Sequence, residues 1–86
     1  MKYTLIKRKK SFRTKSETEF VSWMKKMDHQ KWIDNQDFME AYSYRKATFE
    51  NILIRHDTEQ NFIEDLQKNK LLKIKSSKVF FGLFNF

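Results

Sequence analysis

Glycine and proline, the residues that most often build tight turns, are almost missing from this chain. Its 86 residues include one glycine, Gly82, and no proline. Glycine supplies the positive φ angles that many hairpin turns need, so a barrel of many strands would lack its corners. The sequence therefore favours helices joined by polar corners, with few strands.

Aromatic residues provide the material for a core. Nine Phe, three Tyr and two Trp indicate a packed interior, although 34% of the residues are charged. A chain of this length buries about two-thirds of its unfolded surface, which is enough for one domain and too little for two. We expect a single small domain over residues 1–86.

The absence of cysteine bears on the compartment. Without cysteine the chain has neither disulfides nor thiol ligands, and a reducing environment fits best. The first apolar run is shorter than the ~7–15 residues of a secretory signal core, and no segment is long enough to span a bilayer. We expect a cytoplasmic protein with no membrane span. Abundant Lys, Asn, Ile and Phe suggest an AT-rich bacterial or phage genome.

Alternation and capping patterns predict the first elements. Residues 2–10 alternate with a period of two and predict one strand, with Tyr3 and Leu5 on its inner face. Ser16 and Glu19 form a capping box at the start of a first helix, which ends near Asp28. Its apolar stripe consists of Phe20, Trp23, Met24 and Met27.

Two further helices follow. Asp34 or Asn35 caps a second helix, which would be about 30 Å long if it continued to His56. Asp57 or Thr58, with Gln60 in the reciprocal position, caps a third helix that stops around Asn69. The predicted buried residues are Phe38, Met39, Tyr42, Phe49, Ile52 and Leu53 in the second helix and Phe62, Ile63 and Leu66 in the third.

The C-terminal segment has β character. Residues 71–86 alternate apolar residues with lysines, pass through Ser76-Ser77-Lys78 and end in a Phe-rich run, which predicts a β-hairpin. The expected fold is α+β: one N-terminal strand, three helices and a C-terminal hairpin that forms a small antiparallel sheet with the first strand.

Charge is segregated along the chain. Residues 1–15 carry seven basic groups and residues 67–86 carry five, and neither segment has an acid, whereas residues 16–66 carry six basic groups against eleven acids. The predicted helices are therefore net acidic and the predicted strands wholly basic. If the two basic ends pair in one sheet, the formal net charge of +7 is concentrated there.

This sheet is the candidate binding site. We expect its outer face to collect Lys2, Arg8, Lys10, Lys73 and Lys75, with Arg13 and Lys78 near the rim. Phe80 and Phe84 would point outward beside these cations. Sheets that present aromatic rings among cations bind single-stranded RNA or DNA by stacking and phosphate neutralisation. The hypothesis is a nucleic-acid-binding accessory or regulatory protein.

The main alternative is a protein-interaction module, such as an inhibitor or a homodimer. It would use the Phe-rich C-terminal strand, by edge pairing or apolar contact, against a second copy or an acidic protein surface. An inert lysine-rich surface and membrane contact through Lys7 to Lys15 are further alternatives.

The search for catalytic patterns gives little. His29 and His56 each adjoin an aspartate, but a metal site needs three or four converging ligands, and both residues fit helix ends better. One glycine cannot build a phosphate-binding loop. An RNA-cutting toxin of the mRNA-interferase kind could have this size, yet no pattern here supports one. We expect no enzyme activity, cofactor or metal.

Overall fold

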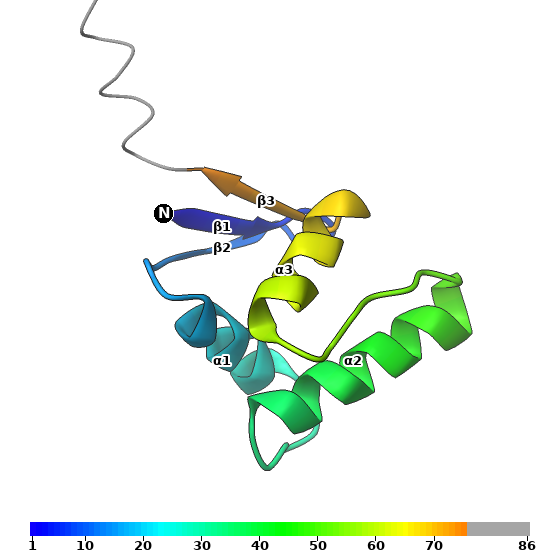
Figure 1. Ribbon diagram of the computed structural model, residues 1–86. Helices are drawn as coiled ribbons and strands as arrows, with labels where there is room; N and C mark the ends of the chain where they lie inside the picture. Colours follow the sequence, from blue (N-terminus) through cyan, green and yellow to red (C-terminus); the bar gives the residue numbers. More distant parts are fainter. Residues whose placement is uncertain (76–86) are drawn as a thin grey trace, which may run out of the picture.

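The protein consists of a three-stranded antiparallel sheet with three helices packed beneath one of its faces (Figure 1). The computed structural model describes residues 1–75. The strands are β1 (Lys2–Leu5), β2 (Lys10–Arg13) and β3 (Leu72–Lys75), in the order β2-β1-β3. The helices are α1 (Glu17–Met27), α2 (Asn35–Glu50) and α3 (Glu59–Lys68). The expected α+β class is confirmed.

The strand arrangement differs from the predicted one. Residues 2–10 do not form a single strand, because the chain turns at residues 6–9 and returns as β2. Lys9 supplies the positive φ of this turn, 54°, where glycine would be the usual residue. β3 pairs with β1 as expected, with Lys2 opposite Lys75 and Leu5 opposite Leu72. The second strand of the predicted C-terminal hairpin lies outside the described residues.

Helix α1 begins and ends as predicted. The Ser16 hydroxyl accepts from the backbone N–H of Glu19 at 3.2 Å. The return bond of a capping box is replaced by a relay. The backbone N–H of Ser16 donates to Thr14 Oγ1, and that hydroxyl donates to the Glu19 carboxylate at 2.6 Å. Asp28 is the C-cap.

Helix α2 is shorter than the longest prediction. It starts after the N-cap Asp34 and ends at Glu50, because Asn51 adopts a left-handed conformation with φ 57°. Phe38 and Met39 are buried as expected. The expected burial of Phe49 and Leu53 is wrong: they are 79% and 80% exposed, and Leu53 lies beyond the end of the helix.

The segment after α2 is extended and returns along the molecule to α3. Ile54 of this segment is buried, and Arg55 binds Asp65 of α3 through its guanidinium group at 2.9 and 3.0 Å and through its backbone N–H at 2.8 Å. Thr58 then caps α3 by accepting from the backbone N–H of Asn61, and the helix ends before Asn69, as predicted.

The core lies between the sheet and the helices. Tyr3 and Leu5 of β1, Leu72 of β3, and apolar residues of all three helices form one buried cluster. Tyr3 stacks on Phe20 with 4.5 Å between ring centroids, which fixes β1 against α1. The predicted core positions on β1 and β3 are therefore confirmed, with Ile74 partly buried beside the cluster.

A polar clamp joins the first turns of the three helices. Glu59 accepts a hydrogen bond from Thr18 Oγ1 at 2.5 Å and another from Asn35 Nδ2 at 2.9 Å. Asn35 Nδ2 is also 3.0 Å from Ser22 Oγ. Because Glu59 lies in the first turn of α3 and faces the first residue of α2, its negative charge also complements both helix dipoles.

Candidate nucleic-acid interface

The outer face of the sheet is built from the residues of each strand that alternate with the core positions. Lys2 of β1 lies opposite Arg13 of β2 and Lys75 of β3. Thr4 lies opposite Ser11 and Lys73. Directly paired residues share a face, so six side chains form this surface. Its charged members, which we call the basic face, are Lys2, Arg13, Lys73 and Lys75.

The basic face contains no negative charge. Within residues 1–75, none of its four side chains takes part in an ion pair. Arg13, Lys73 and Lys75 are exposed, and Lys2 is half-buried. Like charges directly opposite each other on a sheet are destabilising. The Lys2–Arg13 and Lys2–Lys75 pairs therefore destabilise the fold when no ligand is bound. This arrangement suits an anionic partner.

Two hydroxyl groups share this surface with the cations, in the same row as Lys73. Thr4 Oγ1 and Ser11 Oγ are 2.9 Å apart and share a hydrogen bond. Each hydroxyl keeps further capacity to accept or donate. No aromatic ring lies on the outer face among residues 1–75, because Phe12 points to the other side and stacks on Trp23 at 5.1 Å. The described part of the site therefore offers charges and hydroxyls.

The structure separates the other predicted site residues. Lys10 pairs with Leu5 and so lies on the core side of the sheet, at its β2 edge, which corrects the outward position expected for it. Arg8 lies in the β1–β2 turn and faces α2 rather than the outer face. The single-strand prediction for residues 2–10 caused both errors, since the turn changes the register of every residue after it. Lys78, Phe80 and Phe84 lie outside the described residues.

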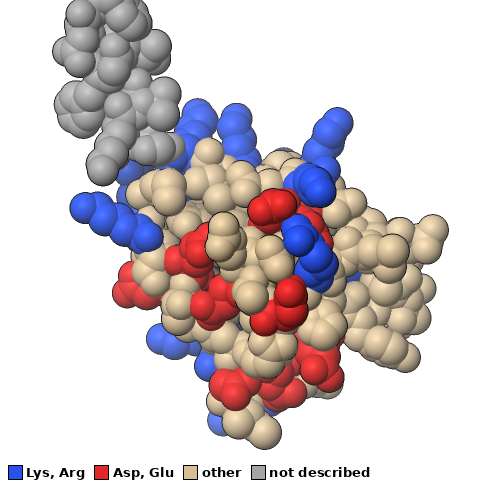
Figure 2. All heavy atoms as spheres, viewed as in Figure 1, with Lys and Arg blue, Asp and Glu red and all other residues tan. Residues whose placement is uncertain are grey.

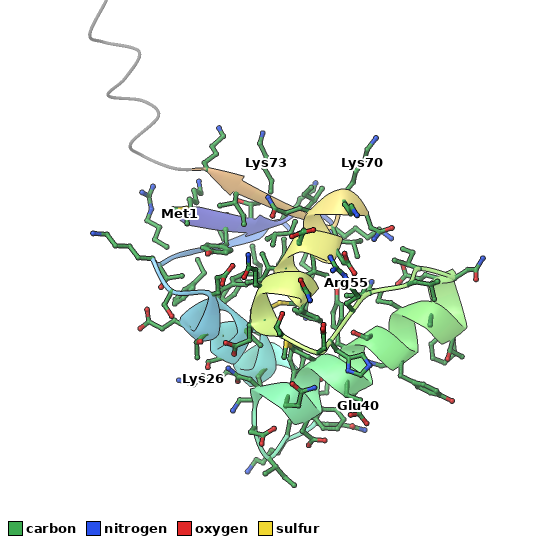
Figure 3. The ribbon with its side chains drawn as sticks, viewed as in Figure 1. Met1, Lys26, Glu40, Arg55, Lys70 and Lys73 are labelled. Atoms are coloured by element: carbon green, nitrogen blue, oxygen red, sulfur yellow. The ribbon has the colours of Figure 1, made fainter. Side chains whose placement is uncertain are left out.

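Acidic side chains gather away from the sheet. Figure 2 shows Lys and Arg along the sheet side and most Asp and Glu over the helices. Figure 3 shows Lys70 and Lys73 projecting from the sheet side, whereas Lys26 and Glu40 lie at the helical side. Many acids have structural partners, such as Asp28 with Arg45 at 3.1 Å and Asp65 with Arg55 at 2.9 Å. The charge segregation in the sequence is thus also a segregation in space.

Asp28 shows how the helical acids are held in place. Burial raises the pKa of its carboxyl group, but hydrogen bonds from Trp32 Nε1 at 2.6 Å and from Arg45 outweigh this effect and keep the pKa below its usual value. Asp28 therefore stays charged, and its hydrogen bonds link α1, the following loop and α2. It is not free to bind a ligand.

The histidines do not form a catalytic constellation with other groups. His29 follows the C-cap of α1, and its backbone N–H donates to Asp28. His56 lies in the extended segment before α3, with its Nδ1 buried and without a hydrogen-bond partner within residues 1–75. The expected position of His56 at the end of a helix is wrong, because α2 already ends at Glu50. No cluster of three potential metal ligands occurs among the described residues.

Comparisons with protein-family models, with curated protein sequences and with solved structures gave no match. Of the helices in residues 1–75, none combines the length and the apolar character that a membrane crossing requires.

Proposed function

We propose that this is a small, non-catalytic nucleic-acid-binding protein, with an accessory or regulatory role, whose basic face contacts the phosphates of RNA or DNA. One observation carries the proposal. Every charge on the outer face of the sheet is positive, and none of these charges has an ion-pair partner within residues 1–75. Phosphate contacts by Lys and Arg dominate the affinity of such surfaces.

The geometry of the face supports binding along a backbone. Lys2 is central, with Arg13 and Lys75 on either side of it, and Lys73 lies one pleat further along β3. Neighbouring strands are about 4.8 Å apart, so the three central cations span roughly 10 Å across the sheet. The Thr4 and Ser11 hydroxyls lie in the next row of the face, beside Lys73, and can donate to phosphate or sugar oxygens.

Single-strand preference is a separate part of the proposal. It depends on Phe80 and Phe84 as stacking platforms, and these residues lie outside the described part of the chain. Base stacking contributes about 1–3 kcal/mol per base, whereas cations alone do not separate single from double strands as strongly. Salt-dependent binding tests the basic face, and strand preference tests the aromatic part.

The decisive experiment is fluorescence anisotropy with short labelled RNA and DNA, single- and double-stranded, over a series of salt concentrations. The double variant Lys73→Glu with Lys75→Glu reverses half of the basic face. We expect at least about tenfold weaker binding, because each lost phosphate contact removes one released counterion. For a single strand the slope of log affinity against log salt should be about −3 in the wild type, from four contacts of about −0.7 each, and shallower in the variant.

A matched control keeps the overall charge constant between variants. Lys26→Glu with Lys31→Glu changes the net charge by the same amount on two exposed residues of the helical part. Equal loss of binding in both double variants would contradict the proposal, since only net charge would then matter. Absence of binding at low salt in the wild type would contradict it as well, and the protein-interaction alternative would then be tested by sedimentation and pull-down.

A further inference from the structure

A cleft on another side of the molecule is the strongest unassigned feature. It lies between the β1–β2 turn and the C-terminal half of α2 and has a volume of about 340 Å³. We call it the turn cleft; its lining residues are Leu5, Lys7, Arg8, Met24, Tyr42, Arg45, Lys46, Phe49, Glu50 and Leu71. Small-molecule sites have volumes of about 300–1,000 Å³ and an apolar lining with a few polar groups.

The charges at the turn cleft do not cancel. Glu50 is its single acid, and it binds both Lys7 at 3.0 Å and Lys46 at 2.6 Å. One guanidinium group, that of Arg8, forms no ion pair within residues 1–75. That of Arg45 is bound to Asp28 through both terminal nitrogens, at 3.1 and 3.4 Å, and keeps its other N–H donors for a ligand. Guanidinium groups match phosphate better than ammonium groups, because their planar fork donates two parallel hydrogen bonds.

The cleft also offers flat apolar surface. Phe49 is 79% exposed, so covering its ring with a flat ligand would bury apolar surface, which is favourable. Tyr42 lies on the same side of α2, with the Arg45 guanidinium 6.0 Å from its ring centroid. Burial and the charge of Glu50 raise the pKa of Tyr42, whereas the charges of Arg45 and Arg8 act in the opposite direction. Arg8 and Arg45 line the cleft together with Tyr42, so both guanidinium groups can act on one ligand.

We propose that the turn cleft binds an aromatic phosphate of nucleotide size, with its ring against Phe49 and Tyr42 and its phosphate on Arg8 and Arg45. A nucleotide is the biological ligand with this chemistry. It could be a free mononucleotide or the end of a strand that is held on the basic face. The cleft shares no residue with the basic face, so the two proposals can fail separately.

The test is a ¹H–¹⁵N NMR titration of the full chain with four probes: adenosine monophosphate, phenyl phosphate, inorganic phosphate and adenosine. We expect the two aromatic phosphates to shift the signals of Arg8, Tyr42 and Arg45. Inorganic phosphate and adenosine should bind about tenfold more weakly or worse, because each lacks one half of the interaction. Equal binding of inorganic phosphate, or shifts spread over all lysines, would overturn the proposal.

Two pairs of variants separate the contributions. Arg8→Ala should weaken binding of adenosine monophosphate about tenfold, the equivalent of one charge-assisted hydrogen bond, whereas Lys31→Ala, a loss of one exposed charge elsewhere, should not. Phe49→Ala should weaken it, whereas Tyr44→Ala should not, although Tyr44 is also exposed on α2 (72%) and lines a different pocket. Unchanged affinity in Arg8→Ala and Phe49→Ala would overturn the proposal.

The source of the nucleotide is decided with the basic-face variant. The double variant Lys73→Glu with Lys75→Glu should bind adenosine monophosphate with the same affinity as the wild type. This result would show that the cleft binds the nucleotide without help from the basic face. If only an oligonucleotide shifts the cleft signals in the wild type, and this effect is lost in the basic-face variant, the ligand is a strand end. Loss of salt-dependent oligonucleotide binding with retained mononucleotide binding would remove the proposed function and leave the cleft.

Discussion

Asp65 is a buried acid whose loss should destabilise the fold. It is 7% exposed and accepts three hydrogen bonds from Arg55. Asp65→Asn should lower the free energy of unfolding by about 1–3 kcal/mol, because it replaces a buried carboxylate that accepts hydrogen bonds from a charged guanidinium group with a neutral amide. Glu64→Gln is the matched control: Glu64 also binds Arg55, but its side chain is 53% exposed, so the loss should stay below about 1 kcal/mol. Urea denaturation measures both, and equal losses would contradict the assignment.

The same carboxyl group should make the fold less stable in acid. The Arg55 hydrogen bonds, which outweigh the effect of burial, hold the pKa of Asp65 below its usual value. Because the folded-state pKa is the lower one, this stabilisation is complete above the unfolded-state pKa of about 3.9 and is lost as the pH falls through the folded-state pKa. Asp65→Asn should therefore lose less stability than the wild type as the pH falls below about 3.9, as followed by circular dichroism.

Ionisation of Tyr42 should destabilise the fold at alkaline pH. Burial and Glu50 raise its pKa to about 12. The folded-state pKa is the higher one here, so the contribution of Tyr42 is complete below the unfolded-state pKa of about 10 and disappears as the pH rises toward 12. Tyr42→Phe has no phenol to ionise and should resist alkaline unfolding better. Identical alkaline midpoints in the two proteins would show that Tyr42 is accessible.

Residues also show what the sequence could predict of the site. Lys2, Lys73 and Lys75 were placed correctly, because alternation within a strand needs only the strand's position. Arg8 and Lys10 were misplaced, because the positive φ of the turn is carried by Lys9, and no glycine, asparagine or proline marks it. The pairing of Lys7 and Lys46 with Glu50 joins residues far apart in sequence. Only the tertiary arrangement brings them together.

At the level of elements, the end of α2 depends on one backbone conformation. Asn51 is the C-cap, with φ 57° and ψ 35°. Asn51→Ala should destabilise the protein by about 1 kcal/mol, since a Cβ without a polar partner is unfavourable in this region. Asn51→Gly should be neutral or slightly stabilising, because glycine adopts positive φ freely. Thermal unfolding of the two variants provides the comparison, and equal destabilisation by alanine and glycine would argue against a conformational cause.

The elements differ in how well their sequences defined them. The starts of α1 and α3 were predicted because a hydroxyl cap is a local interaction, seen here at Ser16 and Thr58. The end of α2 was not, because Phe49 and Leu53 continue a helical spacing but remain exposed, whereas Ile52 packs against the core from outside the helix. Ser43 is buried in α2 instead. Apolar spacing alone does not reveal where a helix leaves the core.

For the whole molecule, the basic face predicts a conflict between binding and stability. Lys2 lies directly opposite both Arg13 and Lys75, and replacing one such repulsion with an attraction is worth about 0.2–1 kcal/mol. Lys75→Glu should therefore raise the free energy of unfolding while it weakens nucleic-acid binding. Lys31→Glu, with the same change in net charge, should do neither. A destabilised Lys75→Glu protein would show that the repulsion is already relieved.

The order of the sheet also has a consequence for how the chain is made. The central strand, β1, is synthesised before β2 and β3, and one of its two edges is completed only by β3, which follows all three helices. The β1–β2 hairpin is a local structure that can form within microseconds, whereas the β1–β3 pairing must close a loop that contains all three helices. Until then a nascent chain carries a strand with an open edge, and the lysines and arginines around it keep that edge from pairing with other chains.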